Sequence, residues 1–232
     1  MADGLYVNMA GAVARAAQLD SVADNLSNAT SPGFKAGRPA FQNFLAQAND
    51  KVYPAAVASG FDLRPGDIQR TGNPMDIVPE GTSFLAVQNG NQIAYTRDGR
   101  LRIDAEGFLV VGEKRVLGVD GQPVSIPPGA QITLQSDAVV SAFGNPIGQL
   151  ALYQLDGPLQ RVGSGMMAPS EGGVAMQVVG PIRIGELEKG NANTLEAAIA
   201  LVNVQRHYEN SMQALQTGKR MDERANELGR VR

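Results

Sequence analysis

Few side chains in this sequence are of the types that carry catalysis or bind metals. The 232 residues contain no cysteine and one histidine, which excludes disulfides, thiolate metal sites and a cysteine nucleophile. His207 stands between Arg206 and Tyr208 in a stretch with a helical pattern. We therefore interpret it as an ordinary helix residue and not as a general base.

Two other local patterns have structural explanations. Asp98, Asp104 and Glu106 form a local acidic group, but the spacing of a calcium-binding EF-hand is absent, and aspartate is common in hairpin turns. Ser164 lies between two glycines without the residues of a nucleophile elbow, and residues 171–173 do not match a phosphate loop. The sequence predicts no catalytic residue, no metal site and no cofactor.

Composition narrows the class of protein. With 43% hydrophobic and 19% charged residues, the chain is globular and not disordered. The net charge is −3 with acids and bases interspersed, so no basic face indicates binding to nucleic acid or to an anionic membrane. We expect neither a cleaved signal peptide nor a membrane span, because charged residues interrupt the first 20 residues and no long apolar run exists.

The sequence patterns that could form binding surfaces for other helices lie at the two ends of the chain. Residues 2–31 and 193–228 have the patterns of amphipathic helices. In the first stretch, apolar residues recur at alternating steps of four and three, an a/d heptad seam. Its members are Leu5, Met9, Ala12, Ala16, Leu19, Ala23 and Leu26. The small residues of this seam would allow another helix to approach closely.

The second stretch begins with Asn193 and Glu196, the spacing of a capping box. Its apolar band is wider than one seam and comprises Leu195, Ile199, Leu201, Val202, Val204, Tyr208, Met212 and Leu215. Helices at opposite ends of a chain cannot bury their apolar faces in a local hairpin, so each must find the other end or another molecule. Two ordinary surface helices packed on a β core remain an alternative.

The middle of the chain has the pattern of short strands. Residues 84–88 are followed by Asn89 and Gly90, a strong hairpin-turn signal, and then by a strand candidate at 93–96. Further short strand patterns at regular spacing predict a small antiparallel barrel or sandwich. Residues 40–47 fit either further helical turns or a short extended piece.

The predicted fold class is α+β, with N- and C-terminal helices forming a coiled-coil-like assembly domain around a central antiparallel all-β domain of barrel or sandwich type. The predicted assembly domain covers residues 1–48 and 190–232. Connectors cover 49–70 and 172–189, and the β domain covers 71–171.

Residues 24–35, 71–77, 95–99, 104–110 and 205–209 contain motifs that resemble those of one family, the axial proteins of the bacterial flagellum, in particular the basal-body rod proteins. Residues 24–35 are similar to the N-terminal signature of that family, through Asn25, Asn28, Gly33, Phe34 and Lys35. Four later stretches are similar to family motifs in the same order: residues 71–77, 95–99, 104–110 and 205–209. The resemblance therefore spans nearly the whole chain.

Length and opening residues distinguish members of that family. Hook proteins are much longer in the middle, so the short β region favours a rod component. The opening residues 4–11 look more like the proximal rod type, and the distal type is the alternative. Departures from the family pattern are Pro79 and Glu80 before Gly81, and Gly218 within the last helix, where the helix could end or fray.

The resemblance implies a structural subunit that is exported by the flagellar type III apparatus without signal cleavage and located in the basal-body rod, in the periplasmic space. Its partners would be other rod proteins and copies of itself in a helical assembly, with the two terminal segments forming an inner tube. The assembly interface would be the N-terminal seam together with Leu195, Ile199, Leu201, Val204, Gln205, Arg206, Tyr208, Met212 and Leu215. A self-contained β-rich binding module is the other non-enzymatic alternative.

Overall fold

The computed structural model describes residues 2–46 and 51–230 and divides the chain into two compact units. The terminal unit comprises Met1–Ser27, Gly37–Gly60 and Asn193–Arg232, and the central unit comprises Asn28–Ala36 and Phe61–Ala192. Each unit is assembled from stretches that are far apart in the sequence. The sequence-predicted boundary between residues 48 and 49 lies outside the described residues.

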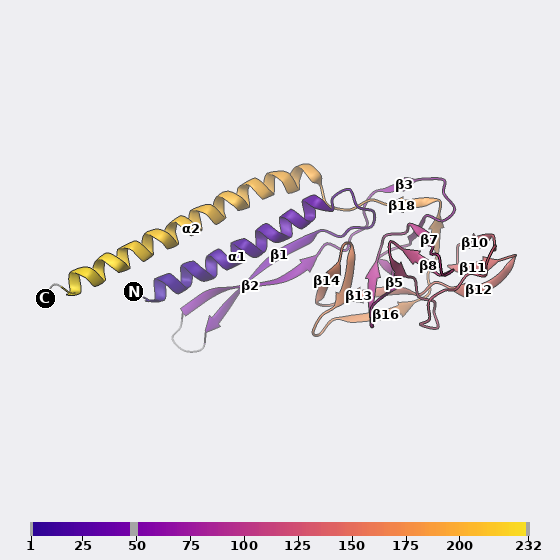
Figure 1. Cartoon of the computed structure of the whole chain (residues 1–232), viewed down its shortest axis with the longest axis horizontal. Coiled ribbons are helices and arrows are strands. Elements are labelled where there is room, and N and C mark those ends of the chain that lie inside the picture. Colours follow the sequence, from indigo (N-terminus) through magenta and orange to yellow (C-terminus); the bar gives the residue numbers. More distant parts are fainter. Residues whose placement is uncertain (1, 47–50, 231–232) are drawn as a thin grey trace. The chain divides into compact units, whose positions relative to one another are not determined.

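One helix from each end of the chain and two strands form the terminal unit (Figure 1). The helices are α1 (Ala2–Ser27) and α2 (Thr194–Arg230), and strands β1 (Gly37–Ala46) and β2 (Lys51–Phe61) pair as a two-stranded sheet. Over its described residues, neither helix has a stretch that is long and apolar enough to cross a membrane.

The first turn of α2 is capped by the residue that the sequence indicates. The Oδ1 atom of Asn193 accepts hydrogen bonds from the backbone N–H groups of Leu195, at 3.0 Å, and Glu196, at 3.3 Å. Such a cap satisfies donors that have no partner within the helix. The helix then continues through Gly218 to Arg230, so Gly218 does not end it.

The two helices contact each other and run in opposite directions (Figure 1). On α2, buried or half-buried side chains recur at steps of four and three, and a face with this period can follow a neighbouring helix. Its members are Ala197, Leu201, Val204, Tyr208, Ser211, Leu215 and Gly218. On α1 the buried side chains include Ala12, Ala14 and Val22, which are small enough to allow close approach.

The predicted fold class, α+β with a coiled-coil-like helical assembly domain, is wrong. The described part of the chain has two helices and eighteen strands and is mostly β. The terminal unit also contains the β1–β2 sheet. Pro39 and Pro54 lie in these strands, and proline opposes a helix interior because it lacks an N–H donor and clashes with the preceding turn. The prediction treated part of this segment as a connector and so missed the sheet.

Antiparallel strands form the central unit in five sheets. The six-stranded sheet has the order β14 (Leu159–Gly163), β15 (Met166–Pro169), β6 (Gln92–Thr96), β5 (Ser83–Asn89), β13 (Leu152–Asp156) and β16 (Val174–Val178). Two three-stranded sheets contain β7 (Leu101–Ile103), β8 (Leu109–Val111) and β9 (Lys114–Arg115), and β10 (Ile132–Leu134), β11 (Val139–Ala142) and β12 (Asn145–Gln149). Two pairs join β3 (Ile68–Arg70) to β18 (Glu186–Glu188), and β4 (Ile77–Pro79) to β17 (Ile182–Ile184).

The β5–β6 hairpin lies where Asn89 and Gly90 predicted a turn, and the two residues of its loop are Gly90 and Asn91. Asn89 pairs with Gln92, and Gly90 has a φ of 62°, a value that glycine adopts without steric cost. Both strands carry side chains of the central core, including Leu85, Val87 and Ala94. Residues 84–87 are all buried, because Phe84 and Ala86 pack in a second core cluster on the other face of β5.

Gly218 yields a prediction about stability. A Cβ atom at this position would meet no atom within 4 Å, and glycine inside a helix costs about 0.5–1 kcal/mol relative to alanine. We expect Gly218→Ala to stabilise α2 by about that amount, measured as a higher thermal midpoint in far-ultraviolet circular dichroism. A lower midpoint would mean that the site needs glycine for packing.

Gly112→Ala is the control for this experiment. Its Cβ atom also has open space, but Gly112 has a φ of 61°, so alanine should destabilise the chain through backbone strain.

Candidate functional site

The side chains that could have formed an enzyme site are engaged in local structure. Asp98 binds Arg100 at 2.6 Å, and Asp104 accepts the backbone N–H groups of Glu106 and Phe108 at 2.9 and 2.8 Å. Among the described residues, no group of three or more histidine, cysteine, aspartate or glutamate side chains could hold a metal ion.

The two remaining enzyme candidates also occupy ordinary structural positions. His207 is exposed on α2. Ser164 lies in the turn between β14 and β15, next to Gly165 with a φ of 67°, and its hydroxyl donates to Oδ1 of Asn28 at 3.0 Å. These contacts give Ser164 a structural role in the central unit.

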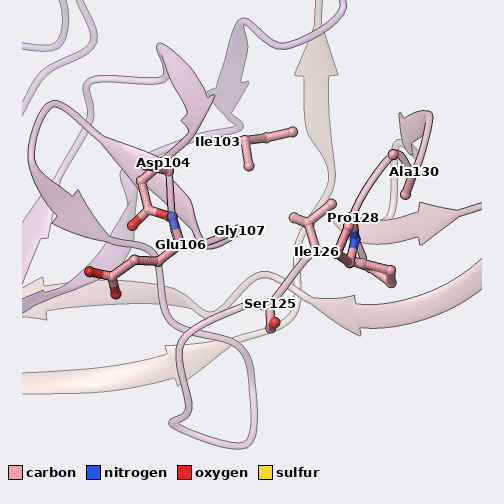
Figure 2. A pocket seen from close by; sticks show the side chains of 11 residues that line it. Ile103, Asp104, Glu106, Gly107, Ser125, Ile126, Pro128 and Ala130 are labelled. Atoms are coloured by element: carbon pink, nitrogen blue, oxygen red, sulfur yellow. The ribbon is translucent and has the colours of Figure 1, made fainter.

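A pocket of about 460 Å³ lies beside the turn after β7. Figure 2 shows the side chains of Ile103, Ile126 and Pro128 around it. Among the residues around this pocket, Asp104 is already bound to backbone N–H groups and Glu106 forms an ion pair with Arg115. The structure indicates no chemistry for this pocket.

The site that stands out is a cluster of three buried charges in the central unit: Lys35, Arg97 and Glu188. Their exposed fractions are 1%, 2% and 1%. One carboxylate oxygen of Glu188 lies 2.6 Å from Nζ of Lys35, and the other lies 2.6 Å from Nε and 2.5 Å from a terminal nitrogen of Arg97. Charges are buried at such cost that they need partners of this kind.

Three separate stretches of chain supply the members of this charge cluster. Lys35 follows the end of α1 by eight residues, Arg97 follows β6 directly, and Glu188 ends β18. Two of them belong to the motifs on which the family resemblance rests, the N-terminal signature and the stretch 95–99. The geometry therefore gives these motifs a shared physical purpose, which is to meet one carboxylate.

Further hydrogen bonds hold each member of the cluster. Nζ of Lys35 also donates to the carbonyl oxygen of Arg64 at 2.7 Å, and the backbone N–H of Gly66 donates to Glu188 at 3.0 Å. The remaining N–H groups of Arg97 donate to backbone carbonyl oxygens of Pro79, Gly81 and Ser83, at 2.6–2.9 Å. Arginine suits this position because its planar guanidinium group directs several donors at once.

The cluster holds two cations and one anion, so both cations depend on the same carboxylate. Burial lowers the pKa of Lys35 because the charged form loses water, while the hydrogen bond and the negative charge of Glu188 oppose that shift. Glu188 is thus the group that makes the buried cations tolerable.

Gly33 and Phe34 of the N-terminal signature hold Lys35 in place. Gly33 has a φ of 67°, and its backbone N–H donates to the carbonyl oxygen of Glu188 at 2.7 Å. Phe34 is fully buried. The guanidinium group of Arg161 stacks over its ring at 4.5 Å and donates to the carbonyl oxygen of Lys35 at 2.9 Å.

Asparagine side chains bind backbone groups in each of the two units. Oδ1 of Asn191 accepts the N–H of Ala36 at 2.7 Å, and its amide nitrogen donates to the carbonyl oxygens of Asp62 and Arg64. In the terminal unit, Asn25 of the same signature binds both the N–H and the C=O of Gly37, each at 2.8 Å.

Sequence reasoning missed Glu188, Asn191 and Arg161. Glu188 belongs to an alternating Glu-Leu-Glu stretch that resembles an exposed edge strand. The sequence offered no signal for these contacts beyond the family motifs that contain Lys35 and Arg97.

The residues of the predicted N-terminal seam differ in how far their side chains are exposed to solvent. Ala12 is buried, Ala16, Leu19 and Leu26 are half-buried, and Met9 and Ala23 are exposed. The side chain of Leu5 lies outside the described residues.

The residues of the predicted C-terminal interface likewise fall into a buried or half-buried group and an exposed group. Leu201, Val204, Tyr208 and Leu215 lie on the inward face of α2, whereas Leu195, Ile199, Met212, Gln205 and Arg206 are exposed. Leu195 and Ile199 are 69% and 55% exposed.

Comparison with known proteins gives matches across the chain. Residues 79–142, which contain Arg97, match the Flagellar hook protein FlgE/F/G D1 domain. Residues 184–228, which contain Glu188, match the Flagellar basal body rod FlgEFG protein C-terminal domain.

Individual relatives match over nearly their whole length. The flagellar basal-body rod proteins FlgF of Salmonella typhimurium and of Escherichia coli are each 29% identical to this chain, and each alignment covers 98% of both proteins. The flagellar basal-body rod protein FlgG of Buchnera aphidicola subsp. Schizaphis graminum is 25% identical, over 98% of this chain and 100% of the relative. These matches confirm the resemblance predicted from the sequence motifs.

The charge cluster yields a second prediction. Glu188→Gln would leave Lys35 and Arg97 buried without their counter-charge, and removing one partner of a buried ion pair costs about 3–5 kcal/mol. We expect the free energy of unfolding of the central unit to fall by about that amount, measured by urea denaturation followed by near-ultraviolet circular dichroism.

Glu171→Gln provides the control, because Glu171 is exposed and its loss should change stability by no more than about 0.5 kcal/mol. Equal effects of the two substitutions would contradict the role assigned to Glu188.

Proposed function

We propose that this chain, a flagellar basal-body rod protein close to FlgF, is a subunit of the proximal rod that polymerises with other axial proteins to form the drive shaft between motor and hook. The observation that carries the proposal is the similarity to FlgF over 98% of the chain at 29% identity. A structural subunit of the rod is the function that this similarity supports.

Assembly requires surfaces that the isolated subunit leaves open, and α2 has one. Leu195, Ile199 and Val202 follow one another at steps of four and three and are 69%, 55% and 50% exposed. We call these three residues the outer stripe. Burying one such side chain contributes about 1.5–3 kcal/mol, so the stripe could supply much of the free energy of a subunit contact.

The inward and outward faces of α2 have different tasks under this proposal. The inward residues, such as Val204 at 5% exposure, stabilise the subunit by packing within the terminal unit. The outer stripe contacts neighbouring subunits. One face of the apolar band thus stabilises the subunit, and the other face binds neighbouring subunits. If these contacts join different surfaces of successive subunits and do not close into a ring, they extend the assembly.

The proximal position is supported by higher identity to FlgF, at 28–29%, than to FlgG, at 25–27%. The distal rod belongs to the same family and is the second candidate. Export through the flagellar type III apparatus and a final location in the periplasmic part of the basal body complete the proposal. It assigns no enzymatic activity to the chain, since the related proteins are structural.

Electron microscopy of basal bodies from a strain that lacks this chain tests the proposal. We expect the inner-membrane ring to remain, the rod to stop short, and no hook to form. The point at which the rod stops distinguishes a proximal from a distal position. An intact rod and hook in that strain would overturn the proposal.

The outer stripe yields a third prediction. Ile199→Asp places a charge at an exposed apolar position, so the subunit should remain folded while its incorporation into rods falls below detection. The measurements are circular dichroism of the purified chain and immunoblotting of isolated basal bodies. Normal incorporation of this variant would remove the stripe from the interface.

Two further variants make this experiment specific. Gln213→Asp introduces the same charge at an exposed polar position of α2 and should leave incorporation unchanged. Val204→Asp buries a charge on the inward face and should instead destabilise the helices of the subunit itself.

A further inference from the structure

Two segments that are far apart in sequence depend on each other within the central unit. The strap, residues 28–36, continues the chain after α1, and the return segment, residues 186–191, leads towards α2. Lys35 of the strap and Glu188 of the return segment are 153 positions apart. Their side chains are nevertheless joined at 2.6 Å in the buried charge cluster.

Backbone hydrogen bonds repeat this connection on both sides of the ion pair. The N–H of Gly33 donates to the carbonyl oxygen of Glu188 at 2.7 Å, and the N–H of Asn191 donates to the carbonyl oxygen of Phe34 at 3.1 Å. The side chain of Asn191 accepts the N–H of Ala36 at 2.7 Å. The strap is therefore held along much of its length by the return segment.

The strap also lies very close to the backbone near Arg97 and to the return segment. A Cβ atom at Gly33 would lie 2.2 Å from the backbone carbon of Arg97, and one at Gly190 would lie 2.9 Å from the carbonyl oxygen of Ala29. Such close backbone approach is possible only with glycine at these positions. The strap thus occupies a narrow slot that Arg97 and the return segment form.

Opening either segment alone would leave buried groups unsatisfied. If the return segment left, Lys35 and Arg97 would lose their carboxylate. If the strap left, Glu188 would lose a cation, and Phe34, which is fully buried, would be exposed to water. Each half-open state loses the contacts that the two segments make with each other. A segment that stays behind is then held by fewer contacts, so the departure of one segment favours the departure of the other.

We infer that the strap and the return segment form a two-part latch, in which the two segments dock and open together around Glu188. Because the strap leads out of α1 and the return segment leads into α2, the attachments of both helices to the central unit become ordered or free as a pair. This inference rests on contacts within the central unit and does not depend on the proposed function.

The latch also sets an order of events during folding. The strap is near the amino terminus, but the groups that hold it come from residues 186–191, near the opposite end. A chain that emerges amino terminus first cannot close the latch until almost all of its sequence is available. Closing such a long loop costs entropy, which the buried contacts must offset.

Hydrogen exchange of the full chain tests this coupling through a variant in the strap. Gly33→Ala introduces a Cβ atom that clashes with Arg97 and also places alanine at a φ of 67°. We expect amide exchange to rise by about tenfold or more in the strap and in the return segment alike, while strands β5 and β6 keep their protection. Gly112→Ala, at a φ of 61° with open space, is the matched control and should affect neither segment.

A variant in the return segment completes the test, because coupling must be reciprocal. Asn191→Ala removes contacts of the return segment, and exchange in the strap should rise by a factor similar to that in the return segment. Faster exchange confined to the substituted segment in either variant would overturn the latch. So would an equal increase in β5 and β6, since the segments would then open only with the whole central unit.

Discussion

The carboxylate of Glu188 is the constraint on which the central unit depends. Lys35 and Arg97 are both excluded from water, and a buried cation without an anion is too costly for a protein of ordinary stability. One glutamate satisfies both, and its backbone also holds Gly33. Because these groups come from the beginning, middle and end of the chain, the central unit can be complete only when all three stretches have met.

The same constraint explains why the units do not follow the sequence. Residues 28–36 belong to the central unit, although in the sequence they stand between α1 and strand β1, which both belong to the terminal unit. Local pattern could predict the Asn89-Gly90 hairpin and the Asn193 cap, since their causes lie within a few residues. It could not predict the partner of Lys35, because an ion pair across 153 positions leaves no period in the sequence. The family motifs marked Lys35 and Arg97 but not their common purpose.

The errors in the helical regions have a related origin. Periodicity identified an apolar band on α2 but could not divide it into the face buried within the subunit and the outer stripe, since both faces repeat at steps of four and three. The β1–β2 sheet was missed because residues 40–47 are compatible with a helix or a strand when taken alone. Pairing with a second segment decides between these states, and such pairing is a property of the folded unit.

Charge and apolar surface have separate roles in this molecule. The strongest electrostatic contacts are buried in the central unit, where they specify which segments meet, and the net charge of −3 is too small and too dispersed to attract a partner over a distance. The outer stripe on α2 carries no charge and is open to other molecules. Contacts between subunits would therefore depend on shape and on apolar burial, so they should resist changes in salt concentration that weaken charged interfaces.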